Sequence, residues 1–168
     1  MIEDFLAARG AAELAHPGGT LLAHLGRTRD ALVAWGARPA LQLAGFAHAA
    51  YGTAGFPQSL VSLAERHVLV DLVGGEAEAI VYAYCALDRE FSYPRLLSRV
   101  VRDRFTGVES RAEPALVRDL VELTFANELD VLAQSPELRK RHAGDLKALL
   151  SSWSAYASVP AAEALERL

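Results

Sequence analysis

Residues 20–51 read TLLAHLGRTRDALVAWGARPALQLAGFAHAAY, and this stretch decides the fold class of the chain. Its apolar positions recur at helical spacing, and Ala and Leu, both strong helix formers, are its commonest residues. Thr20 is a suitable N-cap and Gly36 a suitable stop, so one helix is predicted over residues 20–35. Pro39 fits the first turn of a second helix, which we expect to end near Tyr51.

The same spacing continues outward from this stretch in both directions, while β-branched runs are scarce. Further helices are expected over residues 2–9, 59–73, 76–89, 94–104, 114–133 and 136–159. A chain of 168 residues fits one domain with its own core. The prediction is therefore an all-α helical bundle in which residues 1–168 form a single domain.

The composition narrows the classes of function. The formal net charge is -4 with interspersed signs, whereas a general nucleic-acid binder needs a basic face. No segment approaches the roughly 20 apolar residues that span a bilayer, so we expect a soluble cytoplasmic protein without a membrane partner. The single cysteine, Cys85, lies in an apolar run, which predicts a buried thiol and no disulfide. The partner expected for such a domain is a small-molecule substrate.

Three polar residues fall on apolar helical faces. At about 100° per residue, His48 shares a face with Leu41 and Ala44, and Asn127 lies on the stripe of Leu123. His24 is placed at the edge of the buried face of its helix. Because burying unpaired polar groups is costly, three such placements on three helices indicate a pocket rather than an inert core.

The spacing of these residues resembles the HD-domain superfamily, whose pattern is a His, then a His-Asp dyad, then a distant Asp. His24 matches the first His, and His48 is followed by Ala49 where the dyad has its Asp. Residues 126–130, ANELD, resemble the segment that carries the last Asp, with Asn127 in its place. Residues 16–24, 35–36, 48–56 and 104–107 also resemble an uncharacterised bacterial family of HD-like proteins. The resemblance implies an HD-domain-like helical bundle.

The two departures from the pattern change the expected chemistry. In HD phosphohydrolases, as the resemblance implies, the dyad Asp holds divalent metal and a metal-bound water attacks phosphorus. Ala49 offers no ligand and Asn127 only a neutral amide, so a two-metal phosphohydrolase is the least expected activity. The remaining donors are rich in nitrogen, which suits iron or zinc. His16, in a Pro-Gly-Gly loop, is expected to fold back and complete a three-histidine site with His24 and His48.

Three functions follow from this pocket. The first is a small enzyme that acts on a small organic metabolite with one transition metal held by His16, His24 and His48. Because some HD relatives are iron oxygenases, the resemblance extends to an oxidative reaction. The second is a metal-free enzyme in which His48 or His24 is the general acid or base and Tyr51 or Asn127 orients the substrate. The third is a catalytically silent HD-like domain that binds a ligand or another protein.

A homodimer is a further expectation. The C-terminal helices are rich in Ala and Leu and include Trp153 and Tyr156. If those aromatic rings lie on an exposed apolar face, a second copy of the chain is the simplest partner for it.

Overall fold

The protein is described by a computed structural model of residues 1–168, which is 68% helical with nine helices and two small two-stranded sheets. The prediction of an all-α bundle is confirmed. None of these helices is long and apolar enough to cross a membrane. The helices are α1 (Ile2–Leu6), α2 (Leu21–Ala34), α3 (Pro39–Ala47), α4 (Arg66–Val73), α5 (Gly75–Ala86), α6 (Arg89–Ser92), α7 (Pro114–Gln134), α8 (Pro136–Ser152) and α9 (Val159–Glu166).

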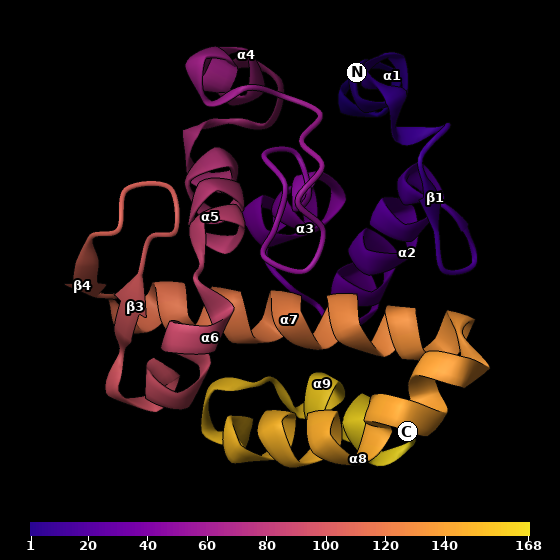
Figure 1. Ribbon diagram of the computed structural model, residues 1–168, viewed down its shortest axis with the longest axis vertical. Coiled ribbons are helices and arrows are strands. Elements are labelled where there is room, and N and C mark those ends of the chain that lie inside the picture. The colour runs from indigo at the N-terminus through magenta and orange to yellow at the C-terminus, as the bar shows by residue number, and fades with distance from the viewer.

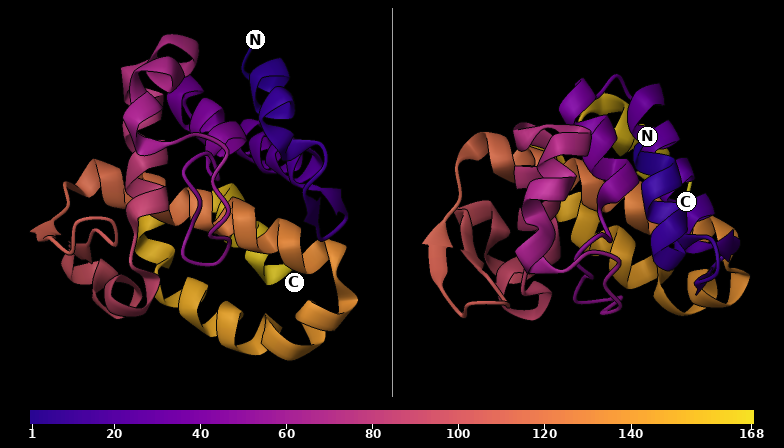
Figure 2. Two further views of the ribbon diagram at one scale, coloured as in Figure 1. Left: turned by 45° about the horizontal axis from the view of Figure 1, so that its top comes forward. Right: turned by 90° about the horizontal axis from the view of Figure 1, so that it is seen from above.

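Helix α7 divides the molecule into two layers. It runs across the middle of the fold, with α2, α3 and α5 on one side and α8 and α9 on the other (Figures 1 and 2). Leu120 and Leu123 belong to the larger core beneath α2, α3 and α5, whereas Val121 and Phe125 belong to a smaller core against α8 and α9. Because both faces are apolar, α7 is enclosed along most of its length.

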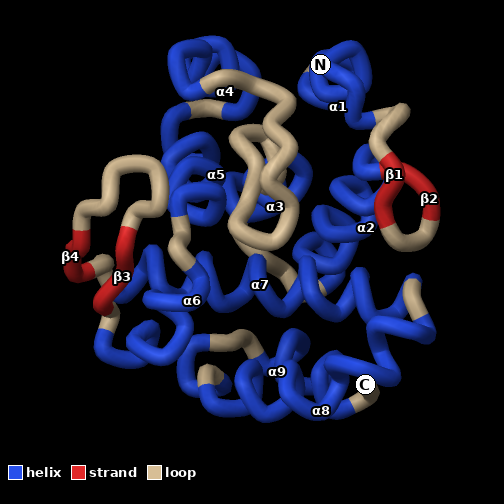
Figure 3. Tube along the Cα trace, in the orientation of Figure 1, coloured by secondary structure: helices blue, strands red, loops and turns tan.

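The predicted helix over residues 94–104 is wrong. The chain forms a 3-10 turn from Tyr93 to Ser98 and then strand β3 (Val100–Arg102), which pairs antiparallel with β4 (Glu109–Arg111) (Figure 3). Arg99 takes a left-handed conformation with φ 63°, which ends the helical path, and the β-branched pair that follows favours a strand. A second hairpin joins β1 (Ala15–His16) to β2 (Gly19–Thr20).

Helix α3 is shorter than predicted. It ends at Ala47 and His48 is its C-cap, so residues 48–51 form turns instead of a further helical turn. The backbone amides of Leu60 and Val61 donate to the carbonyl oxygen of Ala50, which draws the following loop back against the helix end. This loop covers residues 52–62, so α4 begins at Arg66 rather than near Ser59.

Of the two C-terminal aromatic residues, Trp153 is buried and Tyr156 is half-buried. The predicted helix over residues 136–159 breaks at Trp153, whose side chain is 1% exposed and packs in the smaller core. The ring of Trp153 meets that of Tyr93 edge to face, at 4.9 Å between centroids, and Tyr156 packs against the same core. The expected exposed aromatic face is therefore wrong, because α7, α8 and α9 enclose it, and the homodimer loses the observation that suggested it.

Candidate functional site

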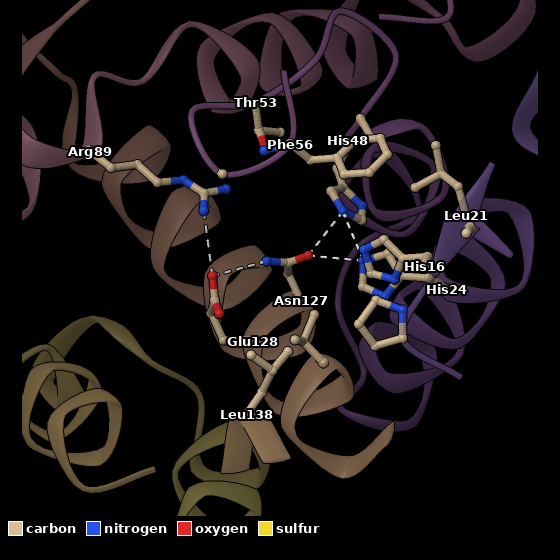
Figure 4. A pocket seen from close by; sticks show the side chains of 15 residues that line it. His16, Leu21, His24, His48, Thr53, Phe56, Arg89, Asn127, Glu128 and Leu138 are labelled. Carbon is tan, nitrogen blue, oxygen red and sulfur yellow. Dashed lines mark hydrogen bonds and ion pairs between the residues drawn. The ribbon is translucent and has the colours of Figure 1, made fainter. Parts of the chain in front are cut away.

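A cavity of about 290 Å³ lies on the larger-core side of α7. Its wall combines the β1–β2 hairpin, α2, the end of α3, the loop that follows α3, the start of α6 and α7 (Figure 4). The polar residues on this wall are His16, His24, His48, Thr53, Arg89, Asn127 and Glu128. The four positions compared with the HD pattern, His24, His48, Ala49 and Asn127, all line this cavity.

Three donor atoms converge at the inner end of the cavity, and we call their residues the histidine cluster: His24, His48 and Asn127. Nε2 of His24 lies 2.9 Å from Oδ1 of Asn127, and Nε2 of His48 lies 3.1 Å from the same oxygen. The two imidazole nitrogens are 3.3 Å apart (Figure 4). All three side chains are buried.

Each side chain of the histidine cluster donates an N–H proton to a group outside the cluster. His48 Nδ1 lies 2.7 Å from the carbonyl oxygen of Gly45, which can only accept, so the proton of neutral His48 is on Nδ1. His24 Nδ1 donates to the carboxylate of Asp130 at 2.6 Å. The amide nitrogen of Asn127 donates to Oε1 of Glu128 at 3.2 Å, which turns its oxygen toward the imidazoles. With a neutral His24, three lone-pair acceptors face one another with no donor among them.

Burial and hydrogen bonding shift the pKa values of the groups in and around the histidine cluster. Burial, followed by the nearby His24, lowers the pKa of His48 to about 3 and that of His16 to about 4. Burial alone would raise the pKa of Asp130, but the hydrogen bonds from His24 and Arg27 outweigh it and lower that pKa. At neutral pH the site thus holds an ionised Asp130 and neutral imidazoles at His16 and His48, and neutral imidazole is the form of histidine that binds metals.

A glycine brings the two histidines together. A Cβ built at Gly45 would overlap a terminal methyl of Leu32 on α2, so a larger residue would have to displace that buried side chain. Thr20 caps the start of α2 by accepting from the backbone amide of Ala23, which fixes the register of His24 one turn later. The prediction that His24 lies at the edge of the buried face is wrong. Its side chain is 1% exposed, because α7 and His16 cover it.

His16 approaches the cluster without joining its donor set. Its ring stacks on that of His24, with centroids 4.0 Å apart and an interplanar angle of 22°. Its Nδ1 is buried and has no hydrogen-bond partner. Arg27 holds this hairpin in place by donating to the carbonyl oxygen of Pro17 while it binds Asp130 through two nitrogens. No group of three or more His, Cys, Asp or Glu side chains has a metal-binding arrangement, and Asn127 occupies the third place instead.

Tyr51 belongs to a different buried site. Its hydroxyl donates to Oε1 of Glu78 at 2.8 Å, and Arg66 binds both oxygens of the same carboxylate at 2.6 and 2.8 Å. We call these three residues the glutamate cluster. Burial, followed by Glu78, raises the pKa of Tyr51. Tyr51 does not line the cavity, so the structure does not bring it to the substrate site that the sequence suggested.

Two acidic residues and one arginine around the cavity were not among the predicted site residues. Asp130 and Glu128 stand three residues and one residue after Asn127 on α7, and Arg89 begins α6. The three-residue spacing of Asn127 and Asp130 places both on one helix face, which is the signal that would have identified Asp130. Nothing local to Arg89 shows that its side chain reaches the cavity.

The chain is thus an all-α protein with a buried pair of histidines at the end of a cavity. It belongs to the family described as a domain of unknown function, DUF6817, whose model matches residues 5–89, about half of the chain. The matched segment includes His24 and His48 and ends before α7, which carries Asn127 and Asp130. No curated protein and no solved structure matches the chain.

Proposed function

We propose that this protein is a small enzyme that acts on a small organic metabolite with one transition metal, iron or zinc, held by His24, His48 and Asn127. The observation that carries the proposal is the meeting of three buried acceptors with no donor among them. Such a set is unfavourable when empty, since each atom presents a lone pair to the other two. A bound cation satisfies all three at once.

The spacing of the donor atoms fits one metal ion. Nitrogen and oxygen ligands at about 2.0–2.1 Å from a shared metal stand about 2.9–3.4 Å from one another in octahedral or tetrahedral sites. The three observed separations are 2.9, 3.1 and 3.3 Å. The imidazole-rich set favours a transition metal over magnesium or calcium.

The groups behind the ligands also fit a metal site. Metal-bound histidines characteristically donate their second ring proton to a carboxylate or a backbone carbonyl, which fixes the ring and raises its basicity. Asp130 serves His24 in this way, and the carbonyl oxygen of Gly45 serves His48. Glu128 orients the amide of Asn127. The set differs from a metal site of two histidines and one carboxylate only in its third donor, which is the amide oxygen of Asn127.

The HD resemblance supports a single metal rather than a pair. Ala49 stands on the cavity wall where an HD dyad would have its carboxylate, and its methyl group offers no ligand. A metal at His24, His48 and Asn127 would supply Lewis-acid activation of a substrate oxygen or water. The chain itself keeps the His48 imidazole neutral, holds the orientations of both rings and encloses the substrate under the loop that carries Thr53 and Phe56.

A metal-free acid–base enzyme is the second candidate, favoured by the contact of 2.6 Å between His24 Nδ1 and Asp130. A carboxylate in this position orients an imidazole and stabilises its protonated form. In this alternative the cation shared by the three acceptors is a proton, with His24 as the general acid. Asn127 would then accept from His24 and position the substrate.

Elemental analysis separates these candidates. Protein expressed with iron and zinc supplied is expected to retain close to one equivalent of metal, and His48→Ala to retain almost none. Tyr51→Phe is the matched control, because it removes a buried hydroxyl from the glutamate cluster and should leave the metal content unchanged. Less than about a tenth of an equivalent in the parent protein would reject the metal centre. If such a metal-free protein showed turnover that depended on His24 and Asp130, that result would support the acid–base enzyme. If it showed no turnover, that result would support a silent binding domain.

A further inference from the structure

Arg89 faces the cavity with most of its hydrogen-bonding capacity unused. Its Nε is buried and has no partner, although the side chain as a whole is 18% exposed. Nη1 lies 3.5 Å from Oε1 of Glu128 and Nη2 lies 3.4 Å from the hydroxyl of Tyr84. Both separations exceed the 2.7–3.2 Å usual for such bonds. A partly buried guanidinium with five donors, a buried Nε and no close acceptor suits a ligand.

Another unpartnered polar atom belongs to a residue of the same cavity wall, and a third belongs to a residue whose ring lies beside Arg89. Four buried side-chain atoms in the protein have no hydrogen-bond partner, and three of them belong to His16, Arg89 and Tyr93. His16 and Arg89 both line the cavity, and the Tyr93 ring centroid lies 6.0 Å from the guanidinium carbon of Arg89. Unpaired buried groups are rare in folded proteins, so their clustering here indicates a place where a polar ligand completes the bonding.

The charges around the cavity favour an anion. Asp130 is already neutralised by Arg27, which binds both its oxygens. Glu128 is the carboxylate nearest Arg89, and it also accepts from the amide of Asn127. A divalent metal at the histidine cluster would therefore leave the cavity with an excess of positive charge. A negatively charged ligand balances it.

We propose that Arg89 binds the oxyanion group of the ligand, a carboxylate or a phosphate, whose remaining part reaches the histidine cluster. The inference rests on the proposed function, because it takes this cavity as the reaction site. Figure 4 places the Arg89 guanidinium on one side of Asn127 and the imidazoles of His24 and His48 on the other. The amide of Asn127 and Glu128 link the two, so a small ligand within about 290 Å³ can touch both. The planar fork of an arginine suits two oxygens of one anion.

Gly55 leaves the space that this guanidinium occupies. A Cβ built at Gly55 would lie 2.9 Å from Nη1 of Arg89, closer than such atoms normally approach. The backbone of Gly55 is not in a left-handed conformation, so alanine fits the loop itself. Gly55→Ala therefore displaces the guanidinium without removing its charge, and it serves as a second variant if loss of Arg89 impairs folding.

The test uses propionate and inorganic phosphate as probes of the whole chain, with and without added zinc. Calorimetry measures their affinities, and the NMR signal of the Arg89 side-chain Nε–H reports contact at the proposed site. At least one probe should bind the parent protein and move that signal. Affinity should fall about 10- to 100-fold in Arg89→Gln, less in Arg89→Lys and about 10-fold in Gly55→Ala. Arg95→Gln removes an exposed arginine nearby and should change nothing.

Each outcome decides the inference separately from the metal site. A preference between the two probes identifies which oxyanion the site takes. If neither probe binds, or if Arg89→Gln and Gly55→Ala bind as tightly as the parent, Arg89 is not an anion site. If phosphate bound only to the added zinc, the NMR signal of the Arg89 Nε–H would not move. That outcome would also show that Arg89 is not an anion site. Binding that depends on Arg89 in a protein that takes up no metal would support the anion site and reject the metal centre.

Discussion

Two buried polar clusters lie on the same side of α7, and they differ in how their hydrogen bonds balance. In the glutamate cluster, two donors, Tyr51 and Arg66, meet the single carboxylate of Glu78 in three bonds of 2.6–2.8 Å. In the histidine cluster, His24, His48 and Asn127 bring three acceptors to one point. The first cluster is complete as it stands, whereas under the proposed function a cation completes the second.

The difference shows why burial alone did not distinguish structural from functional polar residues. Tyr51 and His48 are both almost fully buried, and both stand on the segment that follows α3. What separates them is the partner that each one meets across the fold, together with access to the cavity, which His48 lines and Tyr51 does not. A balanced network stabilises the protein, whereas an acceptor excess beside a cavity suits binding.

The largest expected effect that would test this contrast is on metal affinity. Asp130→Asn replaces the carboxylate that orients His24, and we expect affinity to fall about 10- to 100-fold. Asp119→Asn is the control, because Asp119 is also on α7 and pairs with an arginine, Arg38, at 2.9 Å, but lies outside the cavity. Titration with zinc against a competing chelator measures both. Equal losses in the two variants would mean that the effect is one of general stability.

The next test compares the two clusters by their contribution to folding. Glu78→Gln leaves the guanidinium of Arg66 without its carboxylate and should lower the free energy of unfolding by about 2 kcal/mol, since water reaches part of Arg66. Asn127→Leu removes one of three opposed acceptors and should change that free energy by less than about 1 kcal/mol. Urea denaturation of metal-free protein gives both values. The reverse order would show that the histidine cluster is the structural one.

Acid should destabilise the metal-free protein through His48. Its folded pKa of about 3 lies below the unfolded value near 6.5, so the unfolded chain binds the proton first as pH falls. The stability is therefore complete above about pH 6.5 and declines toward pH 3. Between pH 7 and pH 5 the loss from this residue should be about 2 kcal/mol. His48→Gln should reduce the loss, whereas Tyr51→Phe should retain it. An unchanged pH profile in His48→Gln would mean that other groups titrate.

The smallest expected effect is a gain. Asn127→Asp supplies an anionic oxygen where the amide stood, and zinc affinity should rise about tenfold. The same change places a second carboxylate beside Glu128, so the metal-free protein should become less stable. Affinity and thermal stability measured on one preparation check both parts. A variant that gains no affinity would indicate that position 127 does not contact the metal.

The sequence by itself determined the helical class and part of the buried polar set. Helical periodicity is a local property, and the Thr20 cap, Gly36 and Pro39 mark boundaries through backbone chemistry that needs no distant contact. The same periodicity correctly placed His48 and Asn127 inward. It failed for residues 94–104, where a left-handed Arg99 and pairing with β4 override the local preference.

Only the tertiary structure decided what the buried polar residues meet. Asp130 lies 106 positions from His24 in the sequence, and Glu78 lies 27 positions from Tyr51. Hydrogen bonds act over about 3 Å, so no pattern along the chain reveals which donor reaches which acceptor. Packing of α2 and α3 against α7 made the acceptor excess at His24, His48 and Asn127. The same packing removed Tyr51 from the site and brought Arg89 to the cavity wall.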